Sequence, residues 1–529
     1  MKSIKSSLSE HKHLCYLLVV VLAVRMFIAV VPPLSGDEAT FWEWTRHLAA
    51  GYYAHPPMTA WVVWITTKAF GLSVFSIRLV AGLTHVGTMV FVYLIAYEFF
   101  RNKSYAYLAT LLFALLPISF VLGSMTTTDA MLLVCFTAAT YYFKKAIVDE
   151  QPNYWYFVAI ACGGMLLTKF MAGLFFPGIF FFLLVHKRYR HVFLTKEPYI
   201  AALIASVMFS PFLYWNYKND WLTFQFNFFV RHQNEGFNPL KPLIFVFGQA
   251  VAASPVVFGM IIMAMISLGI SIYRKKMNRI TDQKEQDTIL LLSYIIFFPL
   301  LYFGFTSTGV EIAPHWLATI YPLGVILVFA IFKEWFGELT DNMLWRSKYV
   351  WANMVPAALI SLVMAVLVLF PKILPDRMLY IEKVNGTGSL VSHFYGWEEI
   401  GEHIDKLIPE WKDRPEGFFL TAEDYSLASM LAFYTPSHPS FYLMNSMKKM
   451  IHGKTYLLWE KGKKKIGANT LYIADRFDAW DDRIPGFFKD LKHLDPLIIR
   501  DEQGRILRVF YITVGLHYLG GEPDNLSIW

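Results

Sequence analysis

Two acidic residues near the start of the chain have the type and spacing to do chemistry. Asp37 and Glu38 follow the first apolar run, in the sequence SGDEATFWEW. Ser35 and Glu38 form a capping-box pattern, which predicts a helix that starts at Gly36 or Asp37 and ends near Gly51. Free N–H groups in the first turn of a helix favour an ionised carboxylate. Asp37 is therefore expected to be charged and able to orient or deprotonate a hydroxyl group.

Two explanations remain open for each of these acids. Both carboxylates also suit the start of a helix, and the capping-box role alone accounts for Glu38. The helix carries Phe41, Trp44 and Leu48 on one face, so we expect it to lie in the membrane interface with its Trp residues at headgroup depth. That position would bring Asp37 to the water–lipid boundary, where a lipid-linked substrate presents its polar end.

A third acid and one lysine lie between apolar runs further along the chain. Asp129 is in the sequence SMTTTDA, where an N-cap on the following helix would also explain it. Lys169 lies in a very short connection, where a charge without a partner is unfavourable. Its ammonium group either extends to the lipid headgroups or binds an anion.

Three further residues could bind a phosphate, and each has a structural alternative. Arg231 lies in the connection 217–242, which is also typical of a solvated surface. His315 comes directly before Trp316 at the start of an apolar run, as in an interfacial aromatic belt. His55 precedes two prolines, and a histidine fixed by its neighbours in this way usually has a structural role.

The composition is that of a polytopic helical membrane protein. Hydrophobic residues make up 56% of the chain and charged residues 16%, which is more apolar sequence than a water-soluble core needs. At ~20 residues per crossing, the apolar runs predict about eleven spans. The runs lie near residues 14–31, 78–100, 105–123, 130–147, 154–168, 171–185, 199–215, 243–272, 288–305, 316–332 and 349–370. All three cysteines fall inside them, so neither a disulfide framework nor a CxxC metal pair is expected.

The distribution of positive charge along the chain indicates membrane topology and does not indicate nucleic-acid binding. The formal net charge is +7, but Lys and Arg occur in short clusters between apolar runs, so nucleic-acid binding is not expected. One alternating set of connections, beginning with the N-terminus, holds more than twice as many Lys and Arg as the other. This bias predicts a cytoplasmic N-terminus. An odd number of spans then puts Asp37, Asp129, the connections 217–242 and 306–315, and everything after about residue 371 outside.

The composition changes after residue 370, which predicts two domains. Residues 1–370 would form the transmembrane domain, and residues 371–529 a mixed α/β extracytoplasmic domain with ordinary charge density. Strand-like runs occur at 417–422, 440–444, 455–459, 470–474, 496–500 and 505–514, with a helix over Asp424 to Tyr434. This domain could be a lid over the membrane site, an acceptor-binding module or a scaffold without chemistry.

An ordered set of motifs resembles a known family. Between residues 14 and 332 the chain has a DE pair after the first span, an aromatic helix, G-Y-x-x-H-P-P-x-x-A-W, T-T-D-A, L-T-K and P-H-W. In this order they are similar to the GT-C glycosyltransferases of the protein O-mannosyltransferase superfamily, nearest to bacterial enzymes resembling the lipid A aminoarabinose transferase. The resemblance implies transfer of a sugar, with inversion, from a polyprenyl phosphate such as undecaprenyl phosphate. The acceptor would be lipid A or lipopolysaccharide, another glycan or a protein at the outer face of the inner membrane.

The resemblance also implies roles for single residues. Asp37 would be the catalytic carboxylate and Asp129 the second acid. The residues that would bind the donor phosphate or the substrate are Glu38, His55, Lys169, Arg231 and His315. The aminoarabinose branch has Lys-Pro-Pro where this chain has His55 and two prolines, and Arg-Tyr where it has Thr40 and Phe41. These departures leave the identity of the donor sugar open.

The remaining expectations concern cofactors, partners and a rival function. The chain has neither a GxxxxGK[ST] motif nor a Rossmann fingerprint after a strand, and a phosphate-linked donor needs no nucleotide. A requirement for Mg²⁺ or Mn²⁺ stays open. We expect a monomer in the inner (plasma) membrane. The alternative is a multispan transporter or flippase of a lipid-linked or anionic substrate, although transporter acids usually lie mid-membrane on broken helices.

Overall fold

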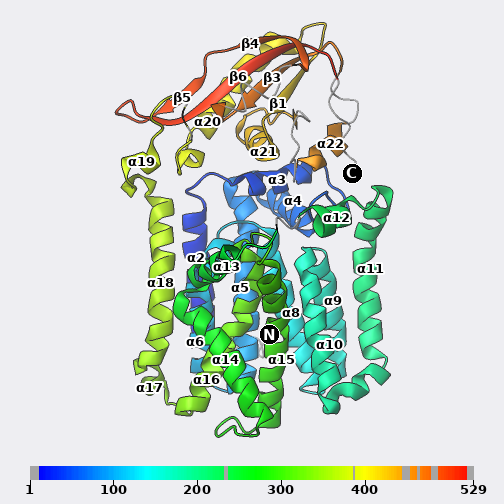
Figure 1. The fold of residues 1–529 in the computed structure, drawn as a ribbon, viewed down its shortest axis with the longest axis vertical. Coiled ribbons are helices and arrows are strands. Elements are labelled where there is room, and N and C mark those ends of the chain that lie inside the picture. The colour runs from blue at the N-terminus through cyan, green and yellow to red at the C-terminus, as the bar shows by residue number, and fades with distance from the viewer. Residues whose placement is uncertain are drawn as a thin grey trace.

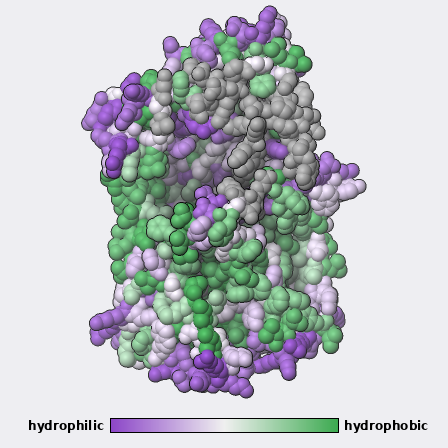
Figure 2. Space-filling model, in the orientation of Figure 1, coloured by the Kyte–Doolittle hydropathy of each residue, from purple (hydrophilic) through white to green (hydrophobic). Residues whose placement is uncertain are grey.

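Two regions of different architecture make up the protein (Figure 1). The computed structural model describes residues 11–231, 236–384, 386, 388–443, 453–460, 465–477 and 486–520. Long helices stand side by side in a bundle, and a twisted sheet with its own helices covers one end of the bundle. Figure 2 shows hydrophobic side chains over the sides of the bundle and hydrophilic ones around its far end. This is the surface expected of a bundle that crosses a membrane.

Eight helices in the described part of the chain are long and apolar enough to cross a membrane. They are α2 (Lys12–Ala29), α5 (Val74–Phe100), α8 (Thr128–Ile147), α11 (Glu197–Lys218), α14 (Pro255–Tyr273), α15 (Gln283–Thr306), α16 (Tyr321–Phe336, continuing the turn Pro314–Ile320) and α18 (Lys348–Leu369). The bent pair Phe170–Val185 and Lys187–Leu194 would be a ninth span. The count of about eleven therefore stays a prediction.

Two of the predicted apolar runs are each divided into two α-helices. Run 105–123 is α6 (Lys103–Leu115) followed by α7 (Pro117–Leu122), and run 243–272 divides into α13 (Leu240–Ala253) and α14. Both breaks fall directly before a proline, whose missing N–H and fixed ring suit the first turn of a new helix. The other bundle helices are α9 (Trp155–Leu166), α10 (Phe175–Val185), α12 (Leu222–Gln225) and α17 (Asp341–Arg346).

The helix α16 lies at the centre of the bundle. Every residue from Tyr321 to Lys333 is buried, as expected for a helix that is apolar on all sides. Gly324 lets α14 pack closely, because a Cβ at this position would lie 2.6 Å from Cδ1 of Ile261. The bundle therefore has a rigid centre around which the remaining helices are arranged.

The predicted helix at residue 36 exists but ends earlier than expected. It is α3 (Gly36–Arg46), with both halves of the capping box formed between Ser35 and Glu38. It lies across the end of the bundle, together with α4 (Met58–Phe70) and beneath the C-terminal domain (Figure 1). The depth of its Trp residues in the membrane stays a prediction, but these side chains do not face lipid. Both are buried, Trp42 against Phe433 of the C-terminal domain and Trp44 against Tyr52 of the segment that follows α3.

The C-terminal domain is a six-stranded mixed sheet with helices. In it β1 (Phe418–Ala422) pairs in parallel with β2 (Phe441–Leu443) and β3 (Asn469–Ala474). The long strand β6 (Ile506–Tyr518) pairs antiparallel with β3, β4 (Phe488–His493) and β5 (Leu497–Arg500). The helices are α19 (Asp376–Leu379), α20 (Trp397–Lys412), α21 (Tyr425–Tyr434) and α22 (Lys454–Glu460). This confirms the predicted mixed α/β architecture, including the helix α21.

Two predictions of secondary structure in this domain failed. Five of the six strand-like runs are strands, but run 455–459 lies in the helix α22. A short run of apolar and aromatic residues fits a strand and a buried helix turn equally well. The strand β4 was missed because it lies at the edge of the sheet and most of its side chains are exposed, so it shows no apolar run.

Candidate active site

A cavity of about 240 Å³ lies where the bundle meets the C-terminal domain. Its walls come from α3, from the 121–129 region and from α21 of the C-terminal domain, among other segments. It brings together six of the seven predicted site residues, which are Asp37, His55, Asp129, Lys169, Arg231 and His315. These residues come from six separate segments of the chain. The fold therefore brings these six residues together on one side of the membrane domain, as predicted.

Asp37 lies in the first turn of α3, where the capping box fixes the start of the helix. The hydroxyl group of Tyr425, the first residue of α21, donates a hydrogen bond of 3.2 Å to Oδ1 of Asp37. Tyr425 also lines the cavity. The C-terminal domain therefore contributes a side chain to the cavity that holds Asp37.

Asp129 and Lys169 form a buried ion pair. Nζ of Lys169 lies 2.8 Å from each carboxylate oxygen of Asp129, and the two side chains are about 4% and 5% exposed. Burial lowers the pKa of Lys169, and the charge of Asp129 opposes this effect. Because the side chain of Lys169 is buried and bonded to Asp129, it does not extend outward to lipid headgroups. The cap of α8 is Thr127, so Asp129 does not serve as an N-cap.

Arg231 and His315 complete the group of cationic and hydrogen-bonding side chains in the cavity. Nε2 of His315 lies 3.8 Å from Oδ2 of Asp129. The guanidinium group of Arg231 lies over the ring of Trp316, 5.1 Å from its centroid. Burial lowers the pKa of Arg231, and the charges of Asp129 and Asp37 oppose this. Three side chains able to hold an anion thus share the cavity with two carboxylates.

His55 lies in the wall of the same cavity. Its side chain is buried, and its ring centroid is 6.4 Å from that of Trp44. Trp44 in turn stacks on Tyr52, with ring centroids 4.2 Å apart. The G-Y-x-x-H-P-P segment thus packs on the aromatic face of α3, which brings His55 to the cavity.

Glu38 has a different environment from the other predicted site residues, since it does not line the cavity. Nε and Nη2 of Arg78 donate to its two oxygens at 2.9 and 2.7 Å. The backbone N–H groups of Ser35 and Thr126 also donate to Glu38, at 2.9 and 3.0 Å. Arg78 further donates to backbone carbonyls of the 29–33 segment. This network ties α3 to α5 and to the segment that leads to Asp129, so it positions both acids.

Arg78 and Tyr425 were not identified from the sequence. Arg78 begins an apolar run, and an arginine there needs a partner, so this signal could have identified it. Tyr425 gives no such signal, because it lies 388 residues from Asp37 in the chain. Among the described residues no group of three or more His, Cys, Asp or Glu side chains could hold a metal ion.

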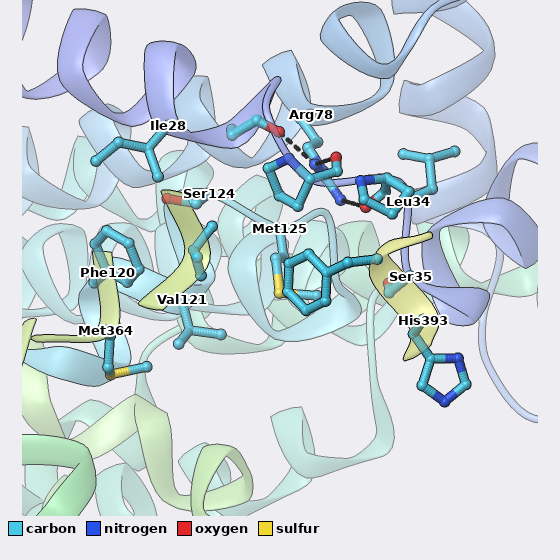
Figure 3. A pocket seen from close by; sticks show the side chains of 15 residues that line it. Ile28, Leu34, Ser35, Arg78, Phe120, Val121, Ser124, Met125, Met364 and His393 are labelled. Carbon is cyan, nitrogen blue, oxygen red and sulfur yellow. Dashed lines mark hydrogen bonds between the residues drawn. The ribbon is translucent and has the colours of Figure 1, made fainter. Parts of the chain in front are cut away.

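A second, apolar cavity of about 300 Å³ adjoins the first (Figure 3). It lies between the end of α2, the 32–35 segment, α7, α18 and residues 393–394 of the C-terminal domain. Figure 3 shows Phe120, Val121 and Met364 on one side of it and His393 on the other. Val121 and Met125 line both cavities. A molecule with an apolar chain could therefore occupy the second cavity and reach the first.

Comparisons with known proteins agree with this architecture. A family model described as dolichyl-phosphate-mannose-protein mannosyltransferase matches residues 54–215. The lipid A galacturonosyltransferase RgtD of Rhizobium johnstonii is 25% identical over 302 residues, which are 56% of this chain and 61% of that protein. An undecaprenyl phosphate-α-4-amino-4-deoxy-L-arabinose arabinosyl transferase of Proteus mirabilis is 25% identical over 24% of each chain. The chain thus spans less than two thirds of the length of these relatives.

The solved structures match over more of the chain. ArnT from Cupriavidus metallidurans in the apo state superposes with a TM-score of 0.62 and 15% identity, covering 94% of this chain and 97% of that one. The same protein bound to undecaprenyl phosphate gives a TM-score of 0.61 at 14% identity. The match includes the C-terminal domain as well as the bundle. The chain therefore has the fold of ArnT and resembles the GT-C glycosyltransferases of the protein O-mannosyltransferase superfamily, as its motifs predict.

Proposed function

We propose that the protein is an inverting glycosyltransferase. It moves a sugar from a polyprenyl-phosphate donor, similar to undecaprenyl phosphate, to a hydroxyl or phosphate group of a cell-envelope acceptor. The observation that carries the proposal is the cavity itself, in which Asp37 shares a space with Lys169, Arg231 and His315. A carboxylate beside several anion-binding groups is what transfer from a sugar phosphate requires.

The reaction follows from these groups. The acceptor oxygen attacks the anomeric carbon while the bond from that carbon to the phosphate oxygen breaks. The polyprenyl phosphate leaves with the electron pair, and Lys169, Arg231 and His315 stabilise its developing negative charge. Asp37 takes the proton of the acceptor hydroxyl. Attack from the side opposite the phosphate inverts the anomeric centre.

Asp129 has a supporting role in this mechanism. Both of its oxygens accept hydrogen bonds from Lys169, so neither is well placed to take a proton from an acceptor. It instead keeps Lys169 charged and fixes the direction of the third N–H group of the ammonium. That group would then donate to the donor phosphate.

The names of similar proteins support the substrate classes. A mannosyltransferase family model and two bacterial lipid-directed or undecaprenyl-phosphate-dependent transferases match parts of the chain. The structure with the same fold was solved with undecaprenyl phosphate. The charge bias of the connections supports a cavity and a C-terminal domain on the periplasmic side of the inner membrane. We further propose that the protein acts there as a monomer.

A lipid fits the acceptor site better than a protein or a free glycan. Ser35, two residues before Asp37, lines the adjoining apolar cavity, and Lys169, Arg231 and His315 do not line it. In an inverting reaction the acceptor and the leaving phosphate occupy opposite sides of the sugar. We propose that the acceptor enters from the side of the apolar cavity and that an acyl chain of the acceptor occupies this cavity.

The test is transfer of radiolabelled sugar from purified polyprenyl-phosphate donors to three acceptors, which are an acylated glycolipid, the same glycan without acyl chains, and a peptide. We expect label in the acylated glycolipid. Label in the peptide alone would contradict a lipid acceptor but keep the transferase. The absence of transfer from every donor, together with movement of a lipid-linked substrate across vesicles, would favour a flippase instead.

A further inference from the structure

The helix α21 of the C-terminal domain packs along α3, and the two helices run in parallel. Residues 438–440 and α22 contact the end of α3 as well. Gly36 packs against Ser426, Thr40 is hydrogen-bonded to Ser429 at 2.9 Å between their hydroxyl oxygens, and Trp42 contacts Phe433 with ring centroids 5.2 Å apart. The contacts advance along both helices in the same order. These contacts therefore fix the position of α21 along α3, in addition to joining the two helices.

The two helices approach each other closely at their first turns. A Cβ added to Gly36 would lie 2.6 Å from Cβ of Ser426 and 3.2 Å from its Cα, so only glycine allows this packing. Gly36 precedes Asp37, and Ser426 follows Tyr425. The tight contact thus fixes the distance between the two helix starts, and with it the distance between Asp37 and Tyr425.

The hydroxyl group of Tyr425 is a hydrogen-bond donor under all ordinary conditions. Burial raises the pKa of Tyr425, and the negative charge of Asp37 raises it further. The phenol keeps its proton and donates it to Oδ1 of Asp37 over 3.2 Å. An ionised carboxylate has only acceptor sites, so this hydrogen bond occupies one oxygen of Asp37 and leaves Oδ2 for the substrate.

We propose that Tyr425 is a positioning residue for sugar transfer, and that the C-terminal domain is in this way part of the catalytic unit. The inference rests on the proposed function, in which Asp37 is the base. Tyr425 holds the carboxylate in one rotamer, with Oδ2 directed to the acceptor hydroxyl. The domain therefore acts on the chemical step through Asp37, in addition to covering the cavity.

The test compares two tyrosines of the same helix. Tyr425→Phe removes the hydroxyl group that donates to Asp37 and keeps the aromatic ring. Tyr434→Phe is the matched control, because its hydroxyl accepts a hydrogen bond from the backbone N–H of Leu34 at 2.9 Å and does not line either cavity. We expect Tyr425→Phe to lower kcat about ten- to a hundredfold, as for one lost hydrogen bond to a charged group, with the KM for the donor unchanged. Tyr434→Phe should keep the wild-type kcat.

A second variant tests the docking itself. Gly36→Ala keeps both Asp37 and Tyr425 but forces the helix starts apart, so it should lower kcat in the same way. Equal kcat values for wild type, Tyr425→Phe and Gly36→Ala would overturn the inference while leaving the transferase intact. Equal losses in Tyr425→Phe and Tyr434→Phe would also overturn it, because the effect would then be structural. A wild-type protein that transfers no sugar would overturn the proposed function and this inference with it.

Discussion

Lys169 is buried, although a lysine in a short connection between spans could have extended to the lipid headgroups. A lysine in a short connection between spans was open to two explanations, and the structure buries it against both oxygens of Asp129. Burial lowers its pKa, and the negative charge of Asp129 opposes this effect. A donor phosphate would add negative charge at the same point, and more of it as the leaving group forms.

This environment gives a prediction for Lys169 in a single-turnover assay. Lys169→Met should lower the rate of sugar transfer more than it weakens donor binding, because the interaction grows in the transition state. Lys169→Arg should restore only part of the rate, since a planar guanidinium must fit a site that holds a compact ammonium. Normal turnover by both variants would return Lys169 to a purely structural role.

The sequence identified those cavity residues that belong to a recognisable local pattern. Asp37 follows from a capping box, and Lys169 from its place between apolar runs. Tyr425 could not be identified in this way. Its role depends on the docking of α21 on α3, and that contact joins residues 388 positions apart. A pattern within a short window contains no information about such a pair.

Among the elements, α3 owes its position to the buried pair of Glu38 and Arg78. As a helix cap alone, Glu38 would contribute ~1 kcal/mol. The structure adds two hydrogen bonds from Arg78 and one from Thr126 to a carboxylate that is fully buried. Removing one partner would leave the other charge buried without compensation. The capping estimate for Glu38 is therefore too small.

We predict that Glu38→Gln and Arg78→Met each destabilise the protein by ~3–5 kcal/mol, as for other broken buried pairs. The double variant should cost less than the sum of the two, because no charge is left unpaired. Chemical denaturation of the purified protein in detergent measures all three. A loss near 1 kcal/mol for Glu38→Gln would contradict the structural role assigned to the pair.

The elements themselves were predictable where one physical signal dominated. Long apolar runs identified the bundle helices, and short strand-like runs identified β1, β2, β3, β5 and β6. The edge strand β4 and the helix α22 were missed because exposure in one case and a short apolar run in the other remove the signal. The burial of α3 was also unpredictable, since a domain more than 300 residues later in the chain covers it.

For the whole molecule, the position of the cavity depends on the topology in the membrane. The bias of Lys and Arg predicts a cytoplasmic N-terminus and a periplasmic C-terminal domain. Alkaline phosphatase fused to the C-terminus should therefore be active, and a reporter that matures only in the cytoplasm should be inactive at the same position. The opposite pattern would put the cavity on the cytoplasmic side and contradict an outer-face reaction.

The catalytic role of Asp37 is the centre of this account, and one comparison tests it most directly. Wild type and Asp37→Asn, both purified and shown to unfold with the same transition, are given a radiolabelled polyprenyl-phosphate sugar and an acylated acceptor. The account predicts labelled acceptor and released polyprenyl phosphate from the wild type, and from Asp37→Asn a rate lower by about a thousandfold or more, as expected when a general base is removed. Equal rates for the two proteins would show that Asp37 is not the base and that the reaction occurs elsewhere.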